Sequence, residues 1–241
     1  MADHRLFVTK DLNTSAIIQL DQAQAHYLLH VLRLQEGAQF LAFDGKDGEW
    51  RVRIIKAGKT GCSIETLEKV REQTEAQDLH YAFAPLKQGR VDYMVQKAVE
   101  MGVSVLQPVF TAHTAVPRIN LDRVRSNAIE AAEQCGVLSI PEVNAALNLE
   151  TLLQACKNER VIVFCDERAS VASPLAVLSR LSGQKVTALL GPEGGFSSDE
   201  RKMLLSKPFV CPISLGPRVM RADTAAVAIL ALINAVLGDW R

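Results

Sequence analysis

The stretch LLGPEGGFSSDE, from Leu189 to Glu200, decides how the carboxyl-terminal half of this chain folds. It begins inside a short apolar run, Val186 to Leu190, which has the composition of a strand covered on both faces. The glycines of Gly191 to Gly195 can adopt backbone angles that a residue with a Cβ atom resists. Ser197 followed by Glu200 has the spacing of a capping box, which begins a helix. The stretch therefore predicts a strand–loop–helix junction.

A second junction of the same kind follows in LGPRVMRADTA, from Leu215 to Ala225. Phe209 to Leu215 reads as its strand, Gly216-Pro217 as its turn, and Asp223 as the N-cap of a long apolar helix. Loops at the carboxyl ends of neighbouring parallel strands form a crevice in which backbone groups can meet a ligand. Neither loop has the spacing of a nucleotide-triphosphate or dinucleotide loop, so a phosphate site is not expected. A pair of plain tight turns stays open as the alternative.

The composition is that of a globular protein with a substantial core. Of the 241 residues, 48% are hydrophobic and 22% are charged, and 27 basic residues balance 27 acidic ones. This balance argues against binding nucleic acid through bulk charge, although it allows a local basic patch. The five cysteines are dispersed and no export signal precedes them, which predicts a reduced cytoplasmic protein. The longest apolar stretch, Ala225 to Leu237, is too short to span a bilayer.

The first seventy residues predict a small barrel-like β module. A helical stretch begins at Asp21, and strands separated by turn residues follow it. In the strand Trp50 to Ile55, apolar residues alternate with Arg51 and Arg53, so one face should be buried and the other basic. The expected strands are Arg5 to Val8, Gln39 to Phe43, Trp50 to Ile55 and Ser63 to Val70.

The polar segment Arg71 to Asp78 reads as a linker, and strands alternate with helices after it. This alternation predicts a mostly parallel sheet with helices on both faces. The predicted organisation is a β domain over residues 1–71, a linker over residues 72–78 and an α/β domain over residues 79–241. The strands of the α/β domain are expected at Leu79 to Pro85, Val103 to Phe110, Val161 to Cys165, Val186 to Leu190 and Phe209 to Leu215.

Several charged residues have both a structural and a functional interpretation. Asp223 is first of all a helix cap, while Arg221 would be a fixed cation beside the crevice. Glu130, Glu133 and Gln134 lie near one face of a helix and read as solvated side chains or as ligand contacts. His26 and His30 have a spacing that could hold a metal, but no further ligand accompanies them, so no metal is expected. The free cysteines read as small buried hydrophobes.

Five stretches, in this order, carry a resemblance to a known family. They are HYLLHVLRL (His26 to Leu34), KQGRVDYMVQKAVEMGVSVLQP (Lys87 to Pro108), EAAEQCG (Glu130 to Gly136), GPEGGFSSDE and LGPRVMRADTA. Together they resemble the RsmE family of 16S ribosomal RNA methyltransferases, over essentially the whole chain. This family makes N3-methyluridine with S-adenosylmethionine.

The resemblance implies an RNA-binding domain of PUA-like type followed by a SPOUT domain with a deep trefoil knot, which periodicity alone would not predict. It also implies a cytoplasmic homodimer that acts on 16S rRNA within the 30S ribosomal subunit, with no DNA or membrane partner. The S-adenosylmethionine site is expected at Leu190, Gly191, Pro192, Glu193, Gly194, Gly195, Leu215, Gly216, Val219, Met220 and Arg221. The catalytic residues are expected to be Arg221 and Asp223. RNA contacts are expected at Arg5, Arg33, Arg51, Arg53, Lys87, Arg90, Glu133 and Gln134.

Two departures from the family pattern concern particular contacts. The family commonly has R-T-E-T-A where this chain has Arg221 to Ala225 with Asp223, a shorter carboxylate. It also often has arginine at the position of Val137. The alternatives are a SPOUT methyltransferase for another RNA position and a non-catalytic RNA-binding protein associated with the ribosome. The intact glycine loop and Arg221 argue against the second.

Overall fold

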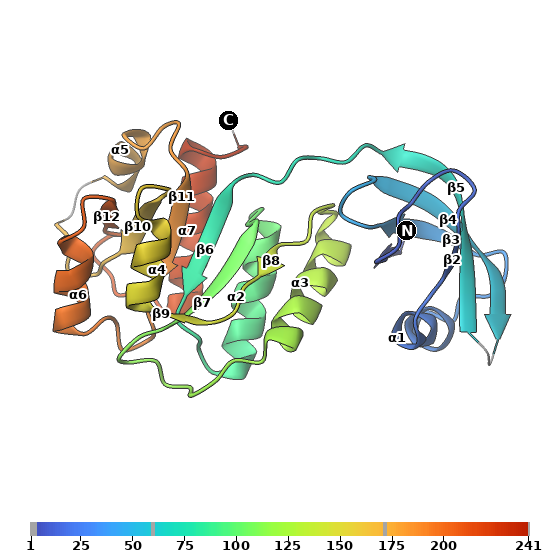
Figure 1. Ribbon diagram of the computed structural model, residues 1–241, viewed down its shortest axis with the longest axis horizontal. Helices are drawn as coiled ribbons and strands as arrows, with labels where there is room; N and C mark the ends of the chain where they lie inside the picture. The colour runs from blue at the N-terminus through green and yellow to red at the C-terminus, as the bar shows by residue number, and fades with distance from the viewer. Residues whose placement is uncertain (1–3, 59–60, 171–172, 241) are drawn as a thin grey trace. The chain divides into compact units, whose positions relative to one another are not determined.

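The computed structural model describes residues 4–58, 61–170 and 173–240 (Figure 1). The chain divides into two compact units. The first unit contains Met1–Glu75 together with Ala132–Ile140, and the second contains Ala76–Ala131 and Pro141–Arg241. No regular element covers residues 72–78, where the sequence predicts a linker.

The first unit is built on a five-stranded sheet with the strand order β1-β3-β4-β5-β2. Strand β1 pairs with β3 in parallel, and the remaining pairs are antiparallel. The elements are β1 (Arg5–Phe7), β2 (Ile17–Gln19), α1 (Gln22–His26), the π-helical turn η1 (Tyr27–Val31), β3 (Gln39–Phe43), β4 (Glu49–Gly58) and β5 (Gly61–Arg71). The predicted β module is confirmed. Strand β2 has three residues and no clear alternation, and the sequence did not indicate it.

Alternation along β4 produces the buried and basic faces that the sequence predicts. Trp50, Val52 and Ile54 are buried, while Arg53 is exposed. The buried side chains pack with Leu28 of η1 in one hydrophobic core. Asp21 caps α1 through a capping box with Gln24. Such a cap contributes about 1 kcal/mol to a helix, which stabilises this very short one.

The segment Ala132–Ile140, which the sequence assigns to the second domain, packs with the first unit because Arg5 binds its backbone. The Arg5 guanidinium donates to the carbonyls of Ala132, Glu133 and Val137, and its Nε lies 2.5 Å from Glu49 Oε1. The Glu133 carboxylate accepts the Phe7 N–H at 2.8 Å. Internal acceptors thus occupy the donors of Arg5, so we do not assign this residue an RNA contact. The basic face was correctly inferred, but sequence pattern does not report such long-range partners.

Three carboxylates of the first unit, from Asp11, Asp44 and Asp47, have oxygens within 4.8 Å of one another. Asp44 is buried, and its Oδ1 accepts the backbone N–H groups of Lys46 and Asp47. The side-chain hydrogen bond to Asp44 raises the pKa of Asp47, and burial raises it further. The folded state therefore binds a proton on the Asp47 carboxylate more tightly than the unfolded state does. Its stabilising contribution is present at low pH and is lost as pH rises through the raised pKa.

We expect Asp47→Asn to stabilise the protein at neutral pH by about 0.5–1.5 kcal/mol, because an amide can donate to Asp44 without a bound proton. The amide oxygen can still accept the Leu12 N–H, which bonds Asp47 Oδ2 at 3.1 Å. Urea unfolding at pH 4.5 and pH 7.5 measures the effect: the stability of wild type should fall more between the two values than that of the variant. Asp11→Asn, at a side chain 78% exposed, should give a smaller change. Equal pH dependence of the stability of wild type and Asp47→Asn would contradict a raised pKa of Asp47 in the folded protein.

The second unit is built on a parallel sheet with the strand order β12-β10-β11-β6-β7-β8, and β9 also pairs with β7. Every strand pair in it is parallel. The strands are β6 (Leu79–Phe83), β7 (Val105–Phe110), β8 (Glu142–Val143), β9 (Leu147–Asn148), β10 (Val161–Cys165), β11 (Val186–Leu190) and β12 (Val210–Ile213). The helices are α2 (Gln88–Glu100), α3 (Leu121–Cys135), α4 (Leu149–Cys156), α5 (Pro174–Ser179), α6 (Ser198–Leu205) and α7 (Ala222–Val236).

Helices cover both faces of this sheet, as the alternation of elements predicts (Figure 1). On one face, leucines of α4 and Leu204 of α6 pack against Ile162, Phe164 and Leu189 of the central strands. On the other face, α7 packs on β11 and against α2. All five residues of β11 are buried, which explains why its sequence is apolar apart from Thr187.

Candidate functional site

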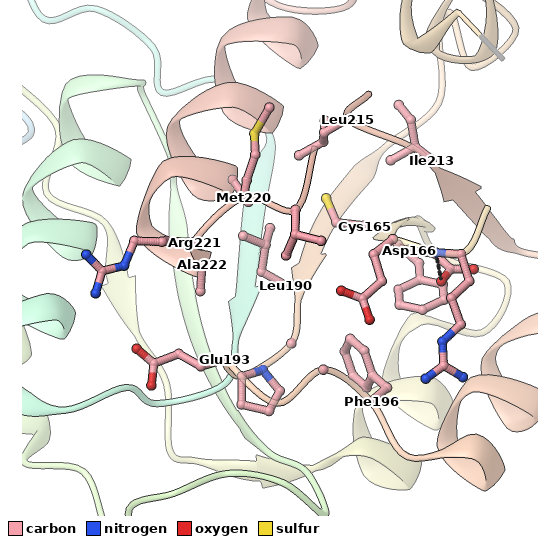
Figure 2. A pocket seen from close by; sticks show the side chains of 18 of the residues that line it. Cys165, Asp166, Leu190, Glu193, Phe196, Ile213, Leu215, Met220, Arg221 and Ala222 are labelled. Carbon is pink, nitrogen blue, oxygen red and sulfur yellow. Dashed lines mark hydrogen bonds between the residues drawn. The ribbon is translucent and has the colours of Figure 1, made fainter. Parts of the chain in front are cut away.

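The candidate site lies where three neighbouring parallel strands end. Strand β10 pairs with both β11 and β12, so the loops that follow these three strands meet at one edge of the sheet. They line a cavity of about 560 Å³, within the range of small-molecule sites (Figure 2). The sequence predicts the loops after β11 and β12. It did not indicate the third, Cys165 to Arg168 after β10, because this loop has no glycine pattern.

The glycine loop after β11 is a tight turn held at both ends. The Gly195 N–H donates to the Pro192 carbonyl at 2.8 Å, and Gly195 has a φ of 66°. This backbone angle is one that glycine adopts without strain. The predicted capping box is confirmed: Ser197 accepts the Glu200 N–H, and Glu200 accepts the Ser197 N–H. Helix α6 therefore starts at a fixed place relative to the loop.

Two ion pairs fix charged side chains around the cavity. Arg90 of α2 pairs with Glu193 of the glycine loop. Arg201 of α6 pairs with Asp166, whose carboxylate is buried and lies 2.8 Å from the guanidinium. In Figure 2, Glu193 and Asp166 lie at opposite sides of the cavity. Each pair joins a cavity loop to a helix, so the loops are fixed by more than their own turns.

The middle of the cavity is apolar. Leu190, Leu215 and Met220 line it between the two charged sides (Figure 2). The Phe196 ring packs edge-on against Phe164, with 5.1 Å between ring centroids. Desolvation raises the pKa of the Cys165 thiol to about 12. Cys165 is thus a neutral wall residue rather than a thiolate nucleophile, as the sequence suggests for the cysteines.

Arg221 lines the cavity immediately before helix α7, and it is exposed. Among the residues that the structure describes, none forms an ion pair with it. Its guanidinium lies on the same side of the cavity as Glu193 (Figure 2). Arg221 is therefore a cation available to a ligand.

Asp223 does not have the position that the sequence predicts. The N-cap of α7 is Arg221, so Asp223 already lies in the first turn, where its Oδ1 accepts the Thr224 N–H at 2.9 Å. The helix begins two residues earlier than a cap at Asp223 requires. The carboxylate still favours the helix by its charge near the N-terminus. Burial raises the pKa of the Tyr81 hydroxyl well above its usual value, and the charges of Cys165 and Asp223 raise it further.

The cavity brings together most of the residues that the resemblance marks for the cofactor. All of them except Gly194 line it, and Arg90, expected to contact RNA, lines it as well. Cavity residues that sequence reasoning missed are Phe164, Cys165, Asp166, Glu167, Arg168, Phe196, Arg201, Ile213, Pro217, Arg218, Ala222 and Ala225. Many of these residues are neighbours in sequence of predicted ones or lie at the carboxyl ends of strands. The ends of the predicted strands were therefore the signal that could have indicated them.

The remaining predicted RNA residues lie outside the cavity. Arg51 and Arg53 form ion pairs with Glu68 and Glu65 across the β4–β5 pair. Three more residues, Arg33, Lys87 and Gln134, are exposed. Glu133 is held by Phe7, as described above.

Comparison with known protein families identifies both units. The profile of the RNA methyltransferase domain matches residues 73–234, and that of the RNA methyltransferase PUA domain matches residues 20–67. The fold and site are thus those of an RNA methyltransferase with a PUA domain. Ribosomal RNA small subunit methyltransferase E from Rickettsia conorii is 30% identical over 97% of this chain and 96% of its own length. The chain belongs to the ribosomal RNA small subunit methyltransferase E family.

Other relatives agree with this assignment. Ribosomal RNA small subunit methyltransferase E from Synechocystis is 35% identical over 97% of this chain and 78% of its own length. The methyltransferase Lpg2936 from Legionella pneumophila, solved with bound SAM, superposes with a TM-score of 0.89 at 26% identity and covers 99% of this chain and 100% of its own. Ribosomal RNA small subunit methyltransferase E from Neisseria gonorrhoeae has the same fold, with a TM-score of 0.89 at 24% identity over 99% and 100%. Among the described helices, none is long and apolar enough to cross a membrane.

Proposed function

We propose that this protein transfers a methyl group from S-adenosylmethionine to N3 of a uridine in 16S rRNA. The observation that carries the proposal is the cavity formed by three loops, with Arg221 exposed at its edge. Membership in the ribosomal RNA small subunit methyltransferase E family supports it.

The cavity residues fit S-adenosylmethionine. Leu190, Leu215 and Met220 offer an apolar surface for an adenine ring, and the glycine loop brings backbone groups close to it. Glu167 is a cavity carboxylate with no ion-pair partner among the described residues, which suits a ligand that carries positive charge. When bound, S-adenosylmethionine supplies an activated methyl group on a sulfonium.

Arg221 has the chemistry to favour attack by N3 of uracil. This nitrogen carries a proton and becomes nucleophilic when the proton is lost, which leaves negative charge on the ring. A guanidinium held beside the reacting ring stabilises that charge and orients the ring. Because Asp223 does not line the cavity, we assign the proton to water and give Asp223 the role of fixing the start of α7 behind Arg221.

The target uridine must be unpaired or extruded, since N3 faces the partner base in a duplex. We assign RNA backbone contacts to the exposed side chains of Arg33, Lys87 and Gln134, and to the basic strand face with Arg51 and Arg53. Arg90 stays in the cavity wall through its pair with Glu193. A PUA domain in the first unit supports an RNA substrate.

We further propose that the protein is a homodimer formed through α7. Most of this helix is apolar, and Val227, Ala228, Ala231 and Leu232 are only partly buried within one chain. A helix with so little polar surface favours a partner that covers it. Sedimentation equilibrium should give twice the 26.4 kDa chain mass. A monomer at micromolar concentration would reject the dimer.

Methyl transfer to RNA tests the function directly. Small ribosomal subunits that lack the modification, free 16S rRNA and transfer RNA are each incubated with radiolabelled S-adenosylmethionine. We expect label in the rRNA of the subunits, recovered as N3-methyluridine after digestion. Label at another position or in transfer RNA would indicate a methyltransferase with another target. No label, together with no cofactor binding by calorimetry, would reject the proposed function.

A further inference from the structure

A tight turn after β7, residues 111–114, lies against the glycine loop. The turn closes on itself: the Thr111 N–H donates to Thr114 Oγ1 at 2.9 Å, and the Thr114 N–H donates to the Thr111 carbonyl at 3.1 Å. This closure presents His113 to the glycine loop. Neither the cofactor site nor the RNA contacts assigned above include this residue.

His113 is hydrogen-bonded to two carbonyls of the glycine loop. Its Nδ1 lies 3.1 Å from the Gly194 oxygen and 3.2 Å from the Gly195 oxygen. Carbonyl oxygens only accept hydrogen bonds, so Nδ1 must carry the proton and donate to both. The contact therefore selects one tautomer of the neutral ring, in which Nε2 is unprotonated.

The peptide between Gly194 and Gly195 is consequently held on both sides. Its carbonyl accepts from His113, while its N–H donates to the Pro192 carbonyl at 2.8 Å. Because a peptide is planar, these two bonds together fix its orientation. A Cβ atom on Gly194 would lie only 3.3 Å from the His113 Cβ, so the two segments approach closely.

A second bond ties the same turn to the end of the junction. The Ala112 N–H donates to Glu200 Oε1 at 2.7 Å, while Glu200 Oε2 closes the capping box with Ser197. One carboxylate thus joins the turn to the start of α6. The turn holds the glycine loop through His113 and the helix through Ala112.

We propose that His113 is a positioning residue for the cofactor loop. Its Nδ1–H fixes the Gly194–Gly195 peptide and so the glycine loop, of which Gly191 to Glu193 and Gly195 line the cavity. This role rests on the proposed function, because the loop is taken to bind S-adenosylmethionine. Loss of the donor should release the peptide, and binding would then require it to be ordered again.

Three substitutions separate the two ring nitrogens. His113→Asn places an N–H donor near the δ position, His113→Gln places one near the ε position, and His113→Ala has neither. We expect the Ala and Gln variants to bind S-adenosylhomocysteine about threefold to tenfold more weakly, the cost of one hydrogen bond. The Asn variant should stay within about twofold of wild type. Isothermal titration calorimetry measures these constants, and thermal unfolding checks that each variant is folded.

Amide hydrogen exchange of the protein without cofactor tests the same idea independently. Exchange within residues 191–197 should be faster in the Ala and Gln variants than in wild type and the Asn variant, while His30→Ala, at an exposed histidine of the first unit, should leave it unchanged. Equal exchange in wild type and the three His113 variants would overturn the proposal. So would a loss of kcat in His113→Asn with normal affinity, which would make Nε2 a catalytic group. Failure of wild type itself to bind cofactor would instead reject the proposed function, and the exchange result would still decide the role of His113.

Discussion

Replacing Arg221 with alanine is expected to lower the rate of methyl transfer by about 10²- to 10³-fold, the usual effect of losing one group that stabilises transition-state charge. Arg221 lines the cavity and is exposed, and no described residue pairs with it. Its removal should therefore leave the fold intact and change the affinity for S-adenosylhomocysteine only a few-fold. The loss should appear in kcat, measured with saturating RNA and cofactor.

Two matched variants separate this role from simple loss of charge. Arg218→Ala removes a cation from the same loop, also exposed and also in the cavity wall, and should keep kcat within about tenfold. Arg221→Lys keeps the charge without the planar fork and should fall between alanine and wild type. If Arg221→Ala binds cofactor normally and retains the wild-type rate, the catalytic role is wrong. Equal losses in both alanine variants would indicate general attraction of RNA instead.

Local signals predicted the elements around the site well. The apolar run Val186–Leu190 is β11 with the predicted bounds, and Ser197 with Glu200 forms the predicted capping box. Both depend on residues only a few positions apart, so sequence spacing reports them directly. The position of two cavity loops followed from the general rule for parallel strands, without knowledge of the strand order.

Interactions between distant segments could not be predicted in the same way. Arg5 reads as a surface cation, but its partners include carbonyls about 130 positions away. The loop from Cys165 to Arg168 enters the cavity only because β10 lies between β11 and β12 in the sheet. Asp223 is a residue type that often caps helices, yet α7 begins earlier, with Arg221 at the N-cap. The trefoil knot stays an expectation from the family resemblance.

Gly191→Ala is the substitution expected to weaken cofactor binding most, by about tenfold or more. A Cβ atom at this position would lie 2.6 Å from Phe196 Cε2 and 2.9 Å from its Cδ2. The Phe196 ring packs edge-on against the buried Phe164, so it has to give up that contact to move away. Such overpacking costs typically about 1–3 kcal/mol, and here the displaced ring forms part of the cavity wall.

Gly89→Ala is a control that is expected to stabilise the protein rather than to disturb it. Gly89 lies in helix α2 with no atom within 4 Å of an added Cβ, so alanine should stabilise the protein by up to about 1 kcal/mol and leave cofactor binding unchanged. Neither glycine has a positive φ, so backbone strain does not distinguish them. Calorimetric titration with S-adenosylhomocysteine and thermal unfolding measure both effects. The double variant Gly191→Ala with Phe196→Leu should recover part of the lost affinity, because the smaller side chain makes room for the methyl group. Normal binding by Gly191→Ala would mean that the wall formed by Gly191 and Phe196 does not contact the cofactor, and the ligand would then have to lie nearer Arg221 and Met220.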